Sequence, residues 1–159
     1  MRRIFIVCLL LTATFALNLH AQNQKKLTVI DGIYYTDESQ STLYTGEYTE
    51  YYPDGVLKME MFIKNGSPEG IYLLYFPNGK IEEVRSYYNG VFHGTWRTYT
   101  RQGILVGEAR YKKGEKDGLW RIWDEDGKLR YEMHYDNGKK SGIWNMWDEN
   151  GRLISSKQY

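Results

Sequence analysis

The chain has 159 residues, with 21 Lys and Arg, 20 Asp and Glu, and one cysteine. A formal net charge of +1 gives no general attraction for nucleic acid or anionic lipid, and one cysteine excludes an intrachain disulfide. Fifteen tyrosines, five tryptophans and sixteen glycines favour strands and tight turns over helices.

The first 21 residues have the layout of a secretory signal peptide. Arg2 and Arg3 precede an apolar run that ends at Leu17, and Ala21 supplies the small residue expected at a cleavage site. The run is too short for a stable membrane span, although a short N-terminal anchor is an alternative. Cleavage would remove Cys8 and two arginines, leaving 19 basic against 20 acidic residues and a net charge of −1. We therefore predict export to the periplasm, the outer-membrane periphery or the extracellular space.

Glycine recurs every 24 residues from Gly46 onward, and this period indicates a repeat protein. The predicted units span residues 46–69, 70–93, 94–117, 118–141 and a partial 142–159. Two further glycines in each unit mark predicted turns; these turn glycines are Gly55, Gly79, Gly103, Gly127 and Gly151 for the first turn, and Gly66, Gly90, Gly114 and Gly138 for the second.

Each unit is predicted to form strand, turn, strand, turn. The first turn, Pro53-Asp54-Gly55 in the first unit, favours a three-residue loop in which glycine takes the left-handed position and closes a bulge. This loop places Trp123 opposite Leu129; a two-residue type I′ turn is the alternative and shifts the pairing by one. The second turn begins with Asn-Gly and is expected to continue through a three-residue spacer.

The strand after the first turn alternates apolar and polar residues, as expected for a strand with one covered face. Short turns on both sides force antiparallel neighbours. The predicted fold class is all-β: an elongated, single-layer antiparallel meander sheet of repeated β-hairpins, with about ten strands. Residues 22–45 are expected to form a linker and a capping hairpin, in which residues 33–35 and 43–44 flank a polar turn at 37–40.

Two aromatic columns run through the strands before the first turns. The first contains Tyr48, Tyr72, Trp96, Trp120 and Trp144, and the second contains Tyr51, Tyr75, Tyr99, Trp123 and Trp147. The columns lie three residues apart, which places them on opposite faces of the sheet. The rings either replace the core of a one-layer sheet or present a ladder to a glycan or protein partner. The candidate binding surface comprises Trp96, Trp120, Trp144, Tyr99, Trp123 and Trp147.

The sequence predicts no catalytic, cofactor or metal site, because like groups repeat at regular spacing instead of unlike groups converging at one point. Glu132 and His134 share a strand face and could touch a cation, or could simply be solvated. Acidic and arginine side chains recur on the wetter face as either a stripe for a partner or cross-strand ion pairs. A basic rim, either solvated or able to meet a membrane or glycan, contains Lys112, Lys113, Lys116, Lys139 and Lys140.

The stretch from Gly118-Leu119-Trp120 to Asp126-Gly127-Lys128-Leu129 resembles the MORN repeat variant, and the resemblance extends over residues 45–159. It implies a β-hairpin repeat fold without catalysis. Bacterial proteins of this kind are often labelled YwqK-type antitoxins, whereas other MORN proteins are scaffolds or membrane-proximal adaptors. Gln102 and Gly107 depart from the pattern, and Gly107 is expected at a bulge or bend.

The resulting functional prediction is a non-catalytic protein-interaction or scaffold module at the cell envelope. A carbohydrate-binding module and an antitoxin or immunity protein are the alternatives. The expected partner is a protein and not a nucleic acid; a glycan or membrane surface, and self-association through a sheet face or edge, are also possible.

Overall fold

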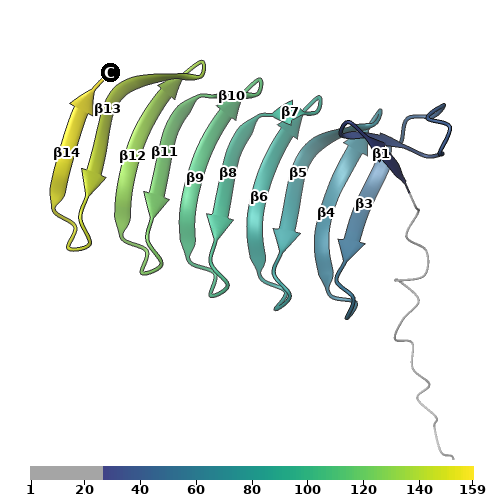
Figure 1. Ribbon diagram of the computed structural model, residues 1–159, viewed down its shortest axis with the longest axis horizontal. Coiled ribbons are helices and arrows are strands. Elements are labelled where there is room, and N and C mark those ends of the chain that lie inside the picture. The colour runs from purple at the N-terminus through teal and green to yellow at the C-terminus, as the bar shows by residue number, and fades with distance from the viewer. Residues whose placement is uncertain (1–26) are drawn as a thin grey trace, which may run out of the picture.

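The computed structural model describes residues 27–159, and the predicted signal peptide lies outside this range. The described chain consists of strands and turns, arranged as one long antiparallel meander with a short hairpin at its N-terminal end (Figure 1). The predicted all-β class and meander are therefore confirmed. No helix that could cross a membrane occurs between residues 27 and 159.

Ten strands follow one another across the large sheet in chain order, and two short strands, β7 and β10, pair beside them. The strands are β3 (Gly46–Tyr51), β4 (Leu57–Lys64), β5 (Ser67–Tyr75), β6 (Ile81–Tyr88), β7 (Val91–Phe92), β8 (Gly94–Tyr99), β9 (Leu105–Lys112), β10 (Glu115–Lys116), β11 (Gly118–Trp123), β12 (Leu129–Asp136), β13 (Lys139–Trp147) and β14 (Leu153–Gln158). The sheet remains open, with β3 at one edge and β14 at the other.

The first turn of each unit is the three-residue loop that the sequence predicts. In the first unit the Tyr52 amide donates to the Val56 carbonyl at 2.8 Å, and Gly55, with φ of 85°, donates to the Tyr52 carbonyl at 2.9 Å. Trp123 consequently lies opposite Leu129, and the register shifts by one residue beside it. The two-residue alternative is wrong, because it would remove this shift.

The second turn is tighter than predicted. Asn65 and Gly66 both have positive φ, 49° and 78°, and they join Lys64 directly to its strand partner Ser67. This is the geometry of a two-residue type I′ turn, whose twist matches that of the flanking strands. The expected three-residue spacer is wrong: its residues, 67–69, belong to β5 and pair with β4, and a bulge farther along accommodates the change of register.

The alternation of the strands gives the sheet two unlike faces. We call one the aromatic face; it carries the first aromatic column, Tyr48, Tyr72, Trp96, Trp120 and Trp144. We call the other the charged face; it carries Glu60, Arg97, Glu108, Arg121 and Glu132. The register that defines them pairs Trp120 with Met133 and, one residue on, Arg121 with Glu132.

The only buried apolar side chains among residues 27–159 are Met59, Met61 and Ile63, at the N-terminal end of the aromatic face. Strands β1 (Thr28–Ile30) and β2 (Ile33–Tyr35) lie over this part of the sheet, and the partly buried residues that pack on the three side chains are Leu27, Tyr34, Tyr44, Tyr48, Tyr72 and Leu74 (Figure 1). The sheet is therefore covered at this end and forms a single layer elsewhere.

The N-terminal hairpin differs from the predicted one in its strand pairing. Asp31 and Gly32, with φ of 51° and 78°, form the turn between β1 and β2. Leu43, expected in the second strand, forms only an isolated bridge with Tyr35. The polar segment instead folds around Asp37, whose carboxylate accepts hydrogen bonds from Ser39, Ser41 and Thr42; these bonds, Ser39's first, hold its pKa below the usual range.

Gly107 borders a register shift, but this shift is not caused by the glycine. The same shift follows the first turn in every unit, including those with larger residues at this position. Gly107 itself has no positive φ and pairs regularly with Thr98 and Ile122. The bulge is a property of the three-residue turn.

Candidate binding surface on the aromatic face

Aromatic rings form a nearly continuous row across the aromatic face. Trp120 lies between Tyr111 and Tyr135, with ring centroids 5.2 Å away on each side, and Trp144 lies between Tyr135 and Tyr159 at 5.1 and 4.9 Å. Tilted and edge-on contacts at these distances are favourable for aromatic pairs. We call this set the aromatic row; it contains Tyr72, Tyr87, Trp96, Tyr111, Trp120, Tyr135, Trp144 and Tyr159.

The row combines two columns of the repeat: the first aromatic column, which is tryptophan from Trp96 onward, and a column of tyrosines formed by Tyr87, Tyr111, Tyr135 and Tyr159. The tyrosines of the other column stand opposite lattice glycines, our name for the glycines that recur every 24 residues from Gly46: Tyr111 stands opposite Gly94, and Tyr135 stands opposite Gly118. A glycine has no side chain on the face, so the tyrosine ring can lean across it towards the next tryptophan. Sequence reasoning placed the tryptophans but missed that these tyrosines lie between them; the available signal was the recurrence of tyrosine every 24 residues from Tyr87 to Tyr159.

Each tryptophan is fixed by a hydrogen bond to the preceding strand. The indole N–H of Trp120 donates to the Arg110 carbonyl at 3.0 Å, and that of Trp144 donates to the His134 carbonyl at 2.9 Å. The polar atom of the ring is thus satisfied within the sheet, and the partly exposed remainder is apolar. The rings therefore support the sheet and offer a surface at the same time.

At one repeat position, the side chain that covers the aromatic row changes along the sheet from apolar to basic. Phe92, in the second unit, packs on Trp96 with centroids 4.2 Å apart, and the Arg85 guanidinium lies 5.1 Å from the Trp96 ring centroid. Lys116 and Lys140 occupy the same repeat position in the next units, and each ammonium lies 4.4 Å from the centroid of its tryptophan, Trp120 or Trp144. A cation over an indole face is attracted by its quadrupole. Two residues of the predicted basic rim therefore lie against rings.

Lys140 also lies over the ring of Tyr159, together with Lys157. Partial burial raises the pKa of its phenol, but hydrogen bonding and charge from Lys140, followed by the charge of Lys157, outweigh this and lower the pKa below its ordinary value. The C-terminal end of the row is therefore a basic environment as well as an aromatic one.

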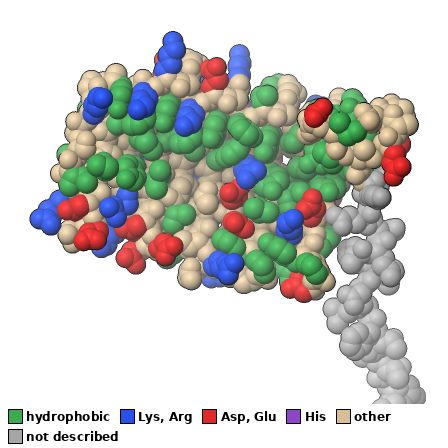
Figure 2. Space-filling view, in the orientation of Figure 1, with side chains coloured by type: hydrophobic (Ala, Val, Ile, Leu, Met, Phe, Trp, Pro, Cys, Tyr) green, Lys and Arg blue, Asp and Glu red, His purple; other side chains and the backbone are tan. Residues whose placement is uncertain are grey.

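The aromatic face is most open in the last two units. Ile122 and Tyr131 pair with one another there, with 42% and 40% of their surface exposed. A shallow hollow of about 280 Å³ lies beside them, lined by Tyr131, Met133, Trp144, Asn145, Met146, Ser155, Lys157 and Tyr159. Figure 2 shows hydrophobic side chains in a band across the sheet, with basic side chains along its upper border.

Comparison with family models matches the MORN repeat variant at residues 44–65, 68–89, 92–113 and 116–137, more than half of the chain. The chain belongs to the MORN repeat variant family. This confirms the family resemblance seen in the sequence. A search of curated proteins found no match.

Each MORN repeat match begins two residues before a lattice glycine, so it includes the position whose side chain covers the row, taken by Phe92 and Lys116. The partial unit that begins at Gly142 lies outside the matched segments. It nevertheless contributes most of β13 and all of β14, and it places Trp144 and Tyr159 in the aromatic row.

The second aromatic column lies on the charged face of the MORN repeats, at the ends near the first turns. A hollow of about 700 Å³ lies between two neighbouring turns, lined by Tyr99, Thr100, Arg101, Gln102, Val106, Ile122, Trp123, Asp124 and Glu125. The structure thus brings Trp96, Trp120 and Trp144 together in one row and keeps Tyr99, Trp123 and Trp147 apart from them. Their role in binding stays a prediction.

Charges in the middle of the charged face are paired across strands. Arg97 contacts Glu108 and Arg121 contacts Glu132, each with an Nε–Oε2 distance of 2.8 Å. Between residues 27 and 159, no three His, Cys, Asp or Glu side chains are placed to hold a metal ion. Exposed pairs of this kind contribute at most about 1 kcal/mol each, so they align strands more than they stabilise them.

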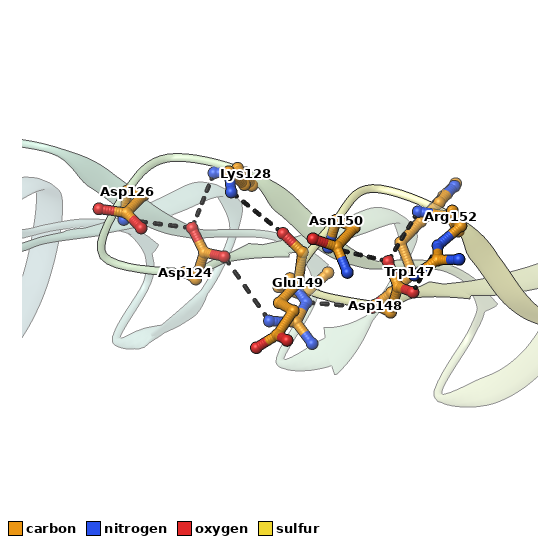
Figure 3. A network of polar contacts seen from close by, with 9 residues as sticks. Asp124, Asp126, Lys128, Trp147, Asp148, Glu149, Asn150 and Arg152 are labelled. Atoms are coloured by element: carbon orange, nitrogen blue, oxygen red, sulfur yellow. Dashed lines mark hydrogen bonds and ion pairs between the residues drawn. The ribbon is translucent and has the colours of Figure 1, made fainter.

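A polar network joins the first turns of the last two units (Figure 3). The Asp124 carboxylate accepts hydrogen bonds from the backbone amides of Lys128 and Asp126, and the Lys128 ammonium donates to the Glu149 carbonyl at 3.0 Å. The hydrogen bond from the Lys128 backbone amide is the main reason that the pKa of Asp124 is lowered. The Asp126 amide and Arg130 lower this pKa further, whereas partial burial raises it. The Asp124 carboxylate therefore stabilises the conformation of its own turn.

Proposed function

We propose that this protein is a non-catalytic interaction or scaffold module at the cell envelope, which binds a protein partner on the open part of its aromatic face. The observation that carries the proposal is the uneven cover of that face. The N-terminal hairpin buries Met59, Met61 and Ile63, whereas Ile122 and Tyr131 in the later units are about two-fifths exposed. A large, partly apolar surface with a basic border is typical of a protein-binding site.

The N-terminal hairpin supports this reading because it already docks a short apolar segment on the same face. The ring of Tyr34 lies 5.5 Å from that of Tyr48 in the row position of the first unit. The backbone amide of Tyr34 donates to the carbonyl of Gly66, in the Asn-Gly turn of the first unit, at 2.9 Å. A partner strand or hairpin could use later units in the same way, with rings against the row and its main chain on a turn.

A catalytic role has little support from this geometry. MORN repeats are generally non-catalytic, and the charged side chains at the centre of the sheet are engaged in ion pairs with one another. The same residue types recur along the sheet, whereas catalysis requires unlike groups at one point. These observations favour recognition over chemistry.

Capture from an envelope extract tests the proposed surface. The chain carries Ile122→Ser with Tyr131→Ser, which removes exposed apolar area from the aromatic face without touching the tryptophan hydrogen bonds. The matched control carries Ile71→Ser with Ile143→Ser, two side chains of the charged face that are 56% and 50% exposed. We expect the control to retain the partners of the unaltered chain and the aromatic-face variant to lose them. Equal retention by both variants would reject the surface.

Two finer parts of the proposal have their own tests. Export predicts that the full chain is processed after Ala21 and that Gln22 becomes the new N-terminus, which N-terminal sequencing of the fractionated protein reports; full-length protein in the cytoplasm would contradict it. An antitoxin role is one form of protein binding, and it requires that the captured partner be toxic when expressed alone and harmless with this chain.

A carbohydrate partner is the second candidate, favoured by the hollow beside Trp144 and Tyr159, where flat rings and a lysine line one open surface. Sugar rings stack on such aromatic faces through their apolar sides. Tryptophan fluorescence measured against a glycan panel decides between the candidates. A saturable change with one glycan would favour it, and a flat response would exclude it.

A further inference from the structure

The third repeat unit lacks a side chain at one position of the aromatic face. Ile122 in β11 pairs with Tyr131 in β12 on one side and with Gly107, at the same repeat position as Tyr131, in β9 on the other. A Cβ added to Gly107 would meet the side chain of Thr98 at 3.6 Å, which is an ordinary contact. Ile122 therefore has a tyrosine beside it on one strand and no side chain on the other.

The residue before Gly107 also departs from the repeat. In the first unit Lys58 holds this position and its ammonium lies 3.0 Å from the Glu50 carboxylate. In the fourth unit Arg130 holds it, with its Nη1 atom 3.6 Å from Oδ2 of Asp124. Val106 takes this position in the third unit, and its short apolar side chain cannot make such an ion pair. Two consecutive positions of the third unit therefore lack the side chains that cover the sheet elsewhere.

A third departure lies at the turn. The Lys80 ammonium donates to the Gln102 carbonyl of the next turn at 2.8 Å, and the Lys128 ammonium donates to the Glu149 carbonyl at 3.0 Å. Ile104 takes the same position in the third unit and has no donor to offer. The first turn of the third unit is therefore not tied to that of the fourth by this bond.

These departures coincide with the hollow of about 700 Å³ between the first turns of the third and fourth units, which we call the Gly107 hollow. Val106 and Ile122 give it apolar walls, and Asp124 lines it from the turn. Ser155 is the other small residue at the Gly107 position, and it lines the hollow of about 280 Å³ in the last units. Both hollows thus accompany a small residue at this one repeat position.

We propose that the Gly107 hollow binds one tyrosine side chain of the protein partner, in the place that Tyr131 fills by itself in the next unit. The inference rests on the proposed function and names the side chain that the partner must present. The ring would lie against Val106 and Ile122, which provide an apolar surface for it. A side chain enclosed in this way would be an anchor of the complex.

The polar end of the hollow favours tyrosine over a purely apolar side chain. Oδ1 of Asp124 accepts the backbone amides of Asp126 and Lys128, and Oδ2 lies 3.6 Å from Arg130. Each carboxylate oxygen has two lone pairs, so Oδ2 can also accept a hydrogen bond from a phenol. A leucine of the partner would fit the apolar walls but would leave this carboxylate without the added donor.

A small probe tests the hollow without the partner. N-acetyl-L-tyrosinamide carries the proposed side chain, and N-acetyl-L-leucinamide is the control. The probes are added to the full chain with isotope-labelled isoleucine methyl groups, which are followed by NMR. We expect the tyrosine amide to shift the Ile122 methyl saturably, to leave Ile71 and Ile143 on the charged face unmoved, and to bind more tightly than the leucine amide. No shift of Ile122, or equal binding of the two amides, would overturn the proposal.

Filling the hollow supplies the matched variants. Gly107→Tyr adds the side chain that the fourth unit has, and the dissociation constant of the tyrosine amide should rise about tenfold or more. Ser155→Tyr adds the same side chain at the same repeat position two units away, and the constant should stay unchanged. Equal constants in the two variants would refute the assignment. Circular dichroism checks the fold, and if Gly107→Tyr unfolds, Gly107→Met, which copies Met59 of the first unit, takes its place.

The captured partner provides the last comparison. Gly107→Tyr should weaken its binding about thirtyfold or more, as expected for loss of an anchor, whereas Gly107→Ala, which leaves most of the hollow open, should bind it as the unaltered chain does. Equal binding by these two variants would overturn the proposal. Because the amide needs no partner, failure of the proposed function is distinguishable: Ile122→Ser with Tyr131→Ser would then retain every captured protein while the unaltered chain still binds the tyrosine amide.

Discussion

Replacing Trp120 with alanine should destabilise the middle of the sheet by about 2–5 kcal/mol. The ring has aromatic neighbours on both sides, each centroid 5.2 Å away, and such pairs contribute about 0.5–1.5 kcal/mol each. Its indole hydrogen bond at 3.0 Å adds about 0.5–1.5 kcal/mol, and the Lys116 ammonium at 4.4 Å adds about 0.5–1 kcal/mol. Trp120→Phe keeps the ring contacts and should lose only about 1 kcal/mol.

The loss should be unevenly distributed along the chain, because a repeat protein is held together by contacts between neighbouring units. The N-terminal end keeps its buried Met59, Met61 and Ile63, whereas the last units have no comparable core among the described residues. Urea unfolding of Trp120→Ala should therefore separate into two transitions. Hydrogen exchange read by mass spectrometry should show β11 to β14 exchanging sooner than β3 to β6.

Two results would refute this reasoning. A loss below about 1 kcal/mol for the alanine variant would mean that the row adds little to the sheet. A uniform acceleration of hydrogen exchange from β3 to β14 would mean that the sheet unfolds as one cooperative unit and that its stability does not depend on contacts between neighbouring rings. Either result would leave the aromatic content without a structural explanation.

Three further predictions concern the backbone and ionisation. Gly107→Ala should raise the free energy of unfolding in urea by about 0.5–1 kcal/mol, because φ there is not positive and the added Cβ would meet Thr98 at an ordinary 3.6 Å; a loss would contradict it. Lys113→Asn should raise the free energy of unfolding by up to about 1 kcal/mol, because Lys113 has φ of 51° in a turn where the other units have asparagine. An unchanged free energy of unfolding would contradict this prediction. Burial, followed by the charge and hydrogen bond of Glu50, raises the pKa of Tyr48 to about 12 from an ordinary value of 10.0. The unfolded chain therefore releases this proton at a lower pH than the folded chain, and the free energy of unfolding should fall as the pH rises from 10 to 12. The urea midpoint should drop less in Tyr48→Phe than in the unaltered chain, and an equal drop would contradict the assignment.

Much of the fold could be predicted because the conformation of each turn is determined by a few adjacent residues. The loop after Tyr52 needs a left-handed residue at Gly55, and that requirement fixes the bulge and the pairing of Trp123 with Leu129. The second turn was predicted in place but not in length, because Asn-Gly alone does not reveal that pairing resumes at the next residue. Lys113 shows why: the same turn forms without asparagine.

The aromatic row could be predicted only in part. Which residues share a face depends on how the bulges shift neighbouring strands, and this decides that Tyr135 falls between Trp120 and Trp144. The N-terminal hairpin had a local signal in Asp31-Gly32 between two apolar runs. Its docking over Met61 did not, because that contact joins distant segments through packing alone.

The most direct test of the binding surface is hydroxyl-radical footprinting of the full chain, free and bound to its captured partner, read by mass spectrometry. The account predicts that Tyr131, Trp144 and Tyr159 on the aromatic face are modified in the free chain and protected in the complex. Phe62 and Ile143 on the charged face should be modified equally in both. Protection of the charged-face residues, with the aromatic row unchanged, would contradict the account.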